Sequence, residues 1–308
     1  MCDGSLATKF TVQFNLFGGS VVGLGTERHE HMFSQIDTLK LCGCFCLTEV
    51  GYGNNAVQME TTATFNESTQ KFTINCPTVN SQKFWITNGA YYAHIAVVFA
   101  QTIVKGVNEG ISAFIVPIRD ENLKTMPGVV IDDMGKKMSS NGVDNARIII
   151  RNVEVPREAL LNKLIDIDSN GIVKTDIKAK RQRFLKTANR LLSGRVCISS
   201  MMISSAKICV TVATKYASVR LSNGVTGLSD TPIGNFQLFN NQVMPLIVKT
   251  FVFNMGLMHI RRVYCNYLLN PDKFTPEDFG NINRLVCVIK PLICWHTCEA
   301  GKIIFTFS

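Results

Sequence analysis

The chain has 308 residues, of which 46% are hydrophobic and 18% are charged, and its formal net charge is +9. This composition supplies enough apolar side chains for a large core and excludes a disordered chain. The length predicts about two domains. Because no uninterrupted apolar run reaches the ~18 residues that a membrane span needs, we predict no transmembrane segment.

The chain is predicted to be helical from residue 6 to about residue 40. Phe10, Phe14 and Phe17 recur at spacings of four and three residues, which predicts one buried helix face. Thr26 is followed by charged residues and predicts a helix start. His29 and His31 are two residues apart, so they do not share a helix face and are not expected to bind a metal together.

Residues 41–155 are predicted to form a β-rich domain, because short apolar runs are separated at regular intervals by turn residues. Asn66–Thr69 reads as a hairpin loop, and Gly106, Gly110 and Gly128 read as turns. The predicted strands are residues 44–47, 62–65, 72–75, 83–86, 95–100, 111–118, 129–131 and 146–155.

Cys42, Cys44 and Cys46 fall at period two, so on a strand their side chains would share one face. Three thiols together raise the possibility of a metal site. No second ligand pair with zinc-like spacing accompanies them, and cysteine is among the residues most often buried. We therefore favour packing over metal binding and predict no metal site. The 11 cysteines include no CxxC pair, which does not fit a secreted disulfide framework.

From Pro156 onward the sequence predicts helices. The first is predicted to run to Arg220, with Met202, Ala206, Val210 and Ala213 on one face. A second is predicted from about Phe236 to Leu269, kinked or begun by Pro245, and a third from about Pro276 to the end. The loop at residues 168–180 is the best candidate boundary between the β-rich part and the helices.

The densest basic run is Lys178–Arg183. A basic surface can attract nucleic acid, an anionic membrane or a phosphate-bearing ligand. No RNP motif, zinc-finger spacing or interleaved aromatic residue accompanies this run. We therefore interpret it as a solvated surface loop and predict no binding to nucleic acid.

Four short sequence motifs resemble those of a known protein family. TEVGYGNN begins at Thr48, ETTATF at Glu60, KFTINCP at Lys71 and KFWITNG at Lys83. In this order they resemble the acyl-CoA oxidases, the flavin-dependent enzymes that open fatty-acid β-oxidation. Further motifs extend the resemblance over nearly the whole chain. They are GISAFIVPIRD, GVDNARIIIRNVEVPREALLNK, SGRV at residues 193–196 and WH at residues 295–296.

The resemblance implies an α+β fold like that of the acyl-CoA dehydrogenases. The end of an N-terminal helical domain (residues 1–40) would precede a central β-barrel-like domain (41–155) and an incomplete C-terminal helical bundle (156–308). The implied activity is FAD-dependent oxidation of fatty acyl-CoA to trans-2-enoyl-CoA, with O2 reduced to H2O2. A homodimer and a peroxisomal location are implied as well.

The resemblance also implies cofactor contacts at Thr48, Thr87, Asn88 and Arg220. A threonine hydroxyl can bond the edge of the flavin ring, and a guanidinium suits the pyrophosphate, often across a dimer interface. Two positions depart from the family: Thr87 stands where a glycine lies against the flavin, and Asn223 replaces a phenylalanine after Arg220. Arg119 and Lys137 match family positions and are expected to be solvated surface residues, and Asp144-Asn145 to be a simple turn.

The catalytic glutamate of the family lies in a TFEG motif that would follow Ser308, so no catalytic residue is predicted within this chain. We therefore expect a form truncated at both ends, and inactive or weakly active because general base catalysis is lost. The alternative is a non-catalytic acyl-CoA-binding or scaffold protein that keeps the oxidase fold.

Overall fold

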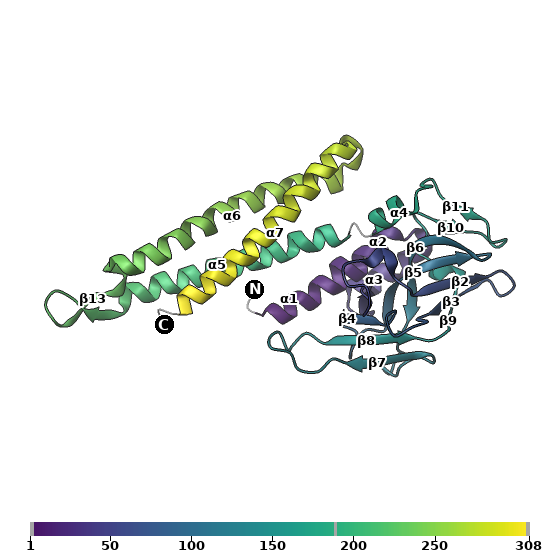
Figure 1. The fold of residues 1–308 in the computed structure, drawn as a ribbon, viewed down its shortest axis with the longest axis horizontal. Helices are drawn as coiled ribbons and strands as arrows, with labels where there is room; N and C mark the ends of the chain where they lie inside the picture. Colours follow the sequence, from purple (N-terminus) through teal and green to yellow (C-terminus); the bar gives the residue numbers. More distant parts are fainter. Residues whose placement is uncertain (1–2, 188–189, 306–308) are drawn as a thin grey trace. The chain divides into compact units, whose positions relative to one another are not determined.

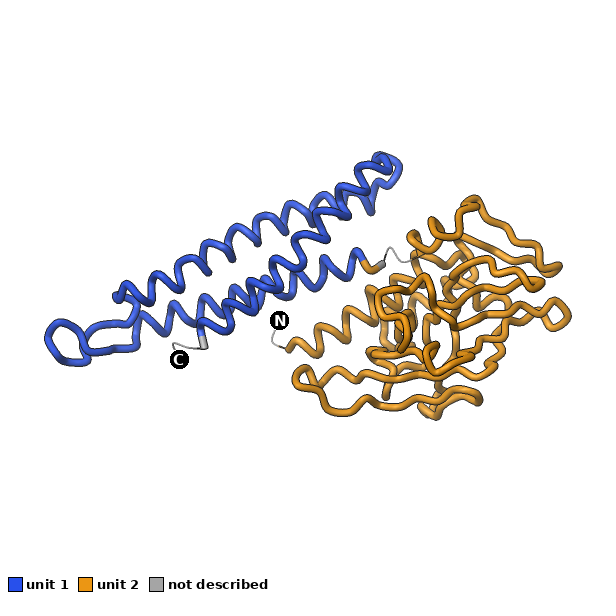
Figure 2. Tube along the Cα trace, viewed as in Figure 1, with its two compact units in different colours: residues 1, 192–308 blue, residues 2–191 orange. Residues whose placement is uncertain are grey.

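The computed structural model describes residues 3–187 and 190–305 (Figure 1). They form two compact units, which divide between residues 191 and 192 (Figure 2). The predicted domain limits at residues 40 and 155 stay a prediction.

The first unit opens with the helices that the sequence predicts, and they lie against the β-structure (Figure 1). Phe17 is fully buried, but Phe10 is about half exposed, so the prediction of one buried phenylalanine face is wrong at Phe10. Thr26 begins a helix as predicted, because its side chain and that of His29 form a capping box. The elements are α1 (Gly4–Phe10), the π-helical η1 (Thr11–Gly18), α2 (Gly19–Leu24), the 3-10 helix η2 (Glu27–Met32) and α3 (Phe33–Asp37).

The β-structure of this unit is a curled six-stranded sheet and a separate three-stranded sheet. In the larger sheet β5 pairs with β1 and β2 in parallel and with β6 antiparallel, and β2, β3 and β9 follow in order. The smaller sheet has the order β4-β8-β7. The strands are β1 (Gly43–Cys46), β2 (Thr62–Asn66), β3 (Lys71–Asn75), β4 (Lys83–Thr87), β5 (Ile95–Val104), β6 (Val107–Pro117), β7 (Val129–Asp133), β8 (Asn145–Ile150) and β9 (Val153–Pro156).

Each predicted strand exists, with two corrections. The single run predicted at residues 146–155 is two strands, because the chain turns at Asn152 (φ +49°) and β9 joins the other sheet. Gly110, read as a turn, lies inside β6, where its φ of +96° suits only glycine.

Two apolar clusters hold the unit together. One fills the space between the sheets and includes Phe72, Phe114 and Ile148. The other joins the helices to the outer face of the large sheet. There Gly43 lies directly under the ring of Phe17, where a Cβ would come within 2.4 Å of the ring atoms, so the helix approaches the strand as closely as glycine permits.

Beyond Pro156 the first unit continues with the short hairpin β10 (Asp166–Ile167) and β11 (Val173–Lys174), and then α4 (Lys180–Thr187). The interpretation of Lys178–Arg183 as a solvated loop is wrong at Arg183. Its guanidinium is buried and donates to the carbonyl oxygens of Ile177 and Glu109, which ties α4 to strand β6.

The second unit contains the three long helices that the sequence predicts: α5 (Arg190–Val219), α6 (Gln237–Leu269) and α7 (Pro276–Phe305). Pro245 lies inside α6 and does not mark its start. Residues 306–308, the end of the third predicted helix, lie outside the described residues. A hairpin of β12 (Leu221–Asn223) and β13 (Ser229–Pro232) connects α5 to α6, and residues such as Ala206, Leu257 and Ile293 form the core between the helices.

Two stretches are long and apolar enough to cross a membrane, judged by length and composition only. They are Lys180–Val219, which includes the undescribed residues 188–189, and Gln237–Leu269. A core helix of a soluble protein meets the same criteria.

Candidate functional site

Thr48 follows the end of β1 and is half-buried. Its carbonyl oxygen accepts a hydrogen bond of 3.0 Å from the amide of Phe84 in β4, so the end of β1 and the start of β4 lie side by side. Within the described part of the chain, the Thr48 hydroxyl has no hydrogen-bond partner. It is therefore free to bond a ligand.

Strand β4 carries Trp85 and the candidate Thr87, and its backbone is irregular there. The pairing with β8 shifts register between Lys83 and Ile86, and Trp85 between them has φ +60°. A bulky residue in this left-handed region costs on the order of 1–3 kcal/mol. The bulge turns the Trp85 indole outward, where it is 53% exposed, while Lys83, two residues before it, and Ile86, directly after it, are buried.

Thr87 and Asn88 follow directly. The Thr87 hydroxyl accepts a hydrogen bond of 3.1 Å from the side-chain amide of Asn145. Asn88 is buried with φ +67°, and its side-chain NH2 donates to the carbonyl oxygen of Lys9. The side-chain oxygen of Asn88 has no partner in the described structure.

The segment after Asn88 is clamped from two sides. The Arg119 guanidinium is buried and donates to the carbonyl oxygens of Gly89, Ala90 and Ala93. Burial lowers the pKa of this guanidinium. The expectation that Arg119 is a solvated surface residue is therefore wrong. Its guanidinium is buried because backbone carbonyl oxygens accept its hydrogen bonds.

Asp144 holds the other side of the same segment. Its buried carboxylate accepts from the amides of Ala90 (3.1 Å) and Tyr91 (3.2 Å) and forms an ion pair with Lys9 of α1. The Lys9 ammonium also lies 4.5 Å from the centre of the Tyr92 ring. Asp144 thus fixes α1 against this loop. The sequence predicted only a simple turn at Asp144 and Asn145, so this contact is an additional role.

A second ion pair lies inside the unit beside Thr48. Lys83 Nζ lies 2.9 Å from Glu49 Oε1, and both side chains are completely buried. Sequence reasoning missed this pair because lysine normally reads as a surface residue. A period of two would bury Lys83 only together with Trp85, which the structure exposes, so the strand pattern gave no usable signal for this pair.

Two cavities adjoin these residues. One of about 370 Å³ is lined by Trp85, Thr87 and Asn145, by Thr8 of α1, and by the loop of residues 137–143 that includes Lys137. Lys137 is half-buried and its ammonium donates to the carbonyl oxygen of Val143. The cavity therefore combines an exposed aromatic face with hydroxyl and amide groups.

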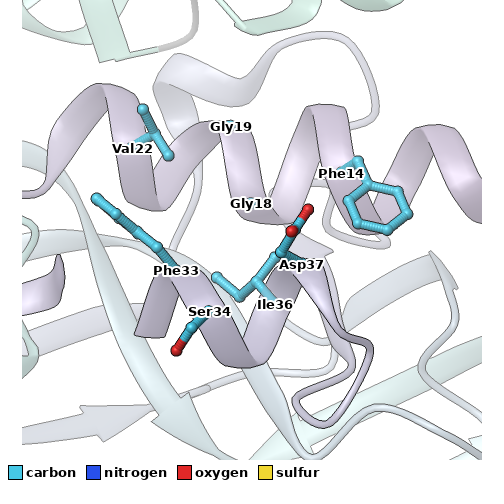
Figure 3. Close-up of a pocket in the computed structure, with 8 residues that line it drawn as sticks. All are labelled: Phe14, Gly18, Gly19, Val22, Phe33, Ser34, Ile36 and Asp37. Carbon is cyan, nitrogen blue, oxygen red and sulfur yellow. The ribbon is translucent and has the colours of Figure 1, made fainter. Parts of the chain in front are cut away.

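The other cavity, of about 390 Å³, is mostly apolar and begins at Asn88. Leu6, Lys9, Phe10, Gln13, Phe14, Leu39, Cys42 and Tyr92 complete its lining. No aspartate or glutamate is among the described residues that line either cavity. A wider hollow of about 550 Å³ lies between α2 and α3 (Figure 3). Its walls are Phe14, Val22, Phe33 and Ile36 with two glycines, and its polar side chains are Ser34 and Asp37, so it is a groove without a cluster of chemically active groups.

The structure brings Thr48, Trp85, Thr87 and Asn88 into one unit, whereas Arg220 belongs to the other. Arg220 follows the end of α5, is exposed, and donates to the Tyr216 hydroxyl at 2.9 Å. Glu299 on α7 pairs with Lys249 of α6.

Cys44 and Cys46 are buried on β1 with their sulfur atoms 3.8 Å apart. Their mutual contact and burial raise the pKa of Cys44 well above its usual value. Among the described residues, no group of three or more His, Cys, Asp or Glu side chains is placed to hold a metal ion.

Two protein-family models match this chain, one over its β-rich part and one over its long helices. Residues 44–153 match the model of the acyl-CoA dehydrogenase middle domain, and residues 189–303 match that of the acyl-CoA oxidase C-alpha1 domain. Because these two models account for most of the chain, it belongs to the acyl-CoA oxidase family.

Individual relatives agree with this. The chain is 34% identical to the peroxisomal acyl-coenzyme A oxidase 2 of Arabidopsis thaliana, over 98% of this chain and 44% of the relative. The crystal structure of acyl-CoA oxidase 1 from Yarrowia lipolytica is 28% identical, with a TM-score of 0.88, over 98% of this chain and 46% of that one. Acyl-CoA oxidase-2 of Caenorhabditis elegans, bound with FAD, ascaroside-CoA and ATP, has the same fold at 24% identity and a TM-score of 0.84, over 96% and 44%. The chain spans less than half the length of the curated relatives it matches.

Proposed function

We propose that this chain supplies the flavin-binding part of an FAD-dependent acyl-CoA oxidase, which converts a fatty acyl-CoA to trans-2-enoyl-CoA and O2 to H2O2. The observation that supports it most directly is the outward face of Trp85 and Thr87 beside a cavity of about 370 Å³, in a member of this family. The strained backbone at Trp85 supports a functional role for the exposed indole.

The residues on this face, together with Thr48 on the segment that is bonded to Phe84, fit a flavin. A planar ring can stack on the Trp85 indole, and the partner-free Thr48 hydroxyl can donate to a ring-edge atom. The Thr87 hydroxyl accepts from Asn145 and keeps its own proton for a ligand. Bound FAD would accept the hydride that leaves the β-carbon of the substrate. The chain's own residues would position the ring and shield one of its faces from water.

The apolar cavity of about 390 Å³ is the proposed site for part of the acyl chain. Leu6, Phe10, Phe14 and Leu39 offer apolar walls, and the cavity begins at Asn88, the residue next to Thr87. Its volume falls in the range typical of small-molecule sites. Because α1 lines both cavities, through Thr8 and Lys9, the Lys9–Asp144 pair would hold the acyl site next to the flavin site.

Three further parts of the proposal come from family membership. Arg220 would bind the FAD pyrophosphate, because an exposed guanidinium suits phosphate. The chain would act as a homodimer. It would be located in the peroxisome, because its Arabidopsis relative is named as a peroxisomal enzyme. Lys207 and Lys249 interrupt the apolar runs of α5 and α6, so we propose that these helices belong to a soluble bundle.

One observation favours a second function, an acyl-CoA-binding protein without catalysis. No described carboxylate lines either cavity, and the nearby Asp144 is engaged by Lys9 and two amides. Removal of an α-proton needs a base within hydrogen-bond reach, and its loss costs about 10²–10⁴-fold in rate. Residues 1–308 alone are therefore expected to turn over very slowly at best.

The experiment that separates the two functions is anaerobic mixing of the FAD-loaded chain with acyl-CoA of several lengths. An oxidase is expected to show a perturbed flavin spectrum on binding, slow bleaching, and peroxide once air is admitted. A binding protein shows the perturbation without bleaching. A flavin spectrum that no acyl-CoA perturbs would overturn the acyl-CoA assignment. A test of the acyl site itself is Phe14→Trp, which narrows the apolar cavity and is expected to weaken binding of long chains more than short ones.

A further inference from the structure

The buried pair of Glu49 and Lys83 is hydrogen-bonded to several chain segments at once. The Glu49 carboxylate accepts from the amides of Glu60 (2.8 Å) and Thr61 (3.1 Å), from the Thr61 hydroxyl, and from Lys83. Lys83 donates in addition to the carbonyl oxygen of Phe99 at 2.8 Å. Four chain segments meet at this point, and each is held by a charge-assisted bond.

The pair is placed between the two residues that the proposed flavin site needs most. Glu49 directly follows Thr48, and Lys83 lies two residues before Trp85. The backbones of the two segments are also joined, since Phe84 donates to Thr48, Val50 to Gln82, and Gly51 to Asn80, each at 3.0 Å. Movement of Lys83 would therefore move both ends of the site.

Trp85 needs such an anchor because its conformation is unfavourable by itself. In a regular strand the side chains alternate, so a buried Lys83 would place Trp85 on the buried side as well. Instead the bulge between Lys83 and Ile86 turns Trp85 outward at φ +60°. Strained residues persist only where their surroundings fix them, and here the fixed points are the ion-paired Lys83 on one side and the buried Ile86 on the other.

We infer that the Glu49–Lys83 pair is a positioning element that holds Trp85 outward and Thr48 beside it, and so forms the flavin-binding face. The inference rests on the proposed function for its ligand, but its effect on Trp85 does not. The pair touches neither cavity, so its action on a ligand is indirect.

The test uses Trp85 as its own reporter. The chain has two tryptophans, so in a Trp295→Phe background Trp85 is the single one. The key variant replaces both partners by apolar groups, Glu49→Leu with Lys83→Met. Apolar replacement of a whole buried pair is often neutral for stability, but this one also leaves the amides of Glu60 and Thr61 and the carbonyl oxygen of Phe99 without their partners. Its melting temperature is therefore expected to fall by on the order of 10 °C while the unit stays folded at the assay temperature. Lys71→Met is the matched control, because Lys71 forms an exposed pair with Glu154 on the neighbouring strands β3 and β9.

Two measurements are made on each variant. Acrylamide quenching of Trp85, without FAD, is expected to fall at least about twofold in the double variant as the strand becomes regular and the indole turns inward. The dissociation constant for FAD is expected to rise at least about tenfold, which is 1.4 kcal/mol. Lys71→Met changes neither. A stable double variant with the parent's quenching or the parent's FAD affinity overturns the inference. If the parent itself binds no FAD, the proposed function fails, and the quenching result still decides the role of the pair.

Hydrogen exchange on the parent covers the case in which the double variant does not fold. If the pair fixes these segments, the amides of Val50, Gly51 and Phe84 are expected to exchange within about tenfold of those in the core of β5, although Val50 is an exposed residue. Exchange of these amides at the rate of a surface loop would overturn the inference without any variant.

Discussion

Replacement of Asp144 by alanine should destabilise the first unit strongly. The buried carboxylate accepts from two amides and pairs with Lys9, and the variant leaves all three donors without a partner. Removal of one partner from a buried pair costs about 3–5 kcal/mol. Because the Lys9 side chain stays about one quarter exposed and can recover some hydration, we expect a loss near the lower end, about 3 kcal/mol.

The assay is urea unfolding followed by Trp85 fluorescence in the Trp295→Phe background, which reports on the first unit alone. Asp144→Asn keeps an acceptor for the two amides and should cost about half as much. The control is Asp132→Ala, which breaks an exposed pair with Arg147 and should cost less than about 1 kcal/mol. A cost below about 1 kcal/mol for Asp144→Ala would refute the argument that this carboxylate fixes α1 to the loop after Asn88.

Three more predictions follow from single side chains. Thr48→Val should leave the melting temperature unchanged, because the hydroxyl has no described protein partner, and should weaken FAD binding about three- to tenfold; an unchanged dissociation constant in an equilibrium titration would argue against flavin contact. Burial lowers the pKa of His29, so below a pH of about 6.5 the unfolded chain binds a proton that the folded chain resists, and stability should fall as the pH drops from there towards the lowered folded pKa; thermal unfolding across this range should show a weaker pH dependence in His29→Gln and no such change in the exposed His31→Gln. Gly43→Ala should cost about 1–3 kcal/mol in urea unfolding, because the new methyl meets the ring of Phe17, and a neutral result would show that the helix can move away.

The sequence predicts the elements of the fold well where hydrophobic periodicity is strong. The strands of the β-rich part are short apolar runs separated by turn residues, and the three long helices keep their apolar spacing over eight turns or so. It predicts less well where tertiary contacts override a local pattern. The turn at Asn152 divides one predicted strand between two sheets, and no residue spacing signals that change of partner.

The buried charged residues were the hardest to predict. Lys83, Arg119, Arg183 and Asp144 are charged side chains that a sequence alone places on the surface. Each is buried because its partners come from distant segments: a carboxylate for Lys83, backbone carbonyls for the two arginines, and a lysine for Asp144. The contacts of Thr48, Thr87, Asn88 and Arg220 with a cofactor stay predictions, as do the domain limits.

The most direct test of the central claim is an FAD titration of the 308-residue chain in the Trp295→Phe background, followed by quenching of Trp85 and of the flavin fluorescence together. If the outward face of Trp85 and Thr87 binds the flavin ring, both signals should be quenched in parallel and saturate at one FAD per chain, and Trp85 should become protected from acrylamide. Absence of saturable binding, or saturable binding that leaves Trp85 fully accessible to acrylamide, would contradict the account.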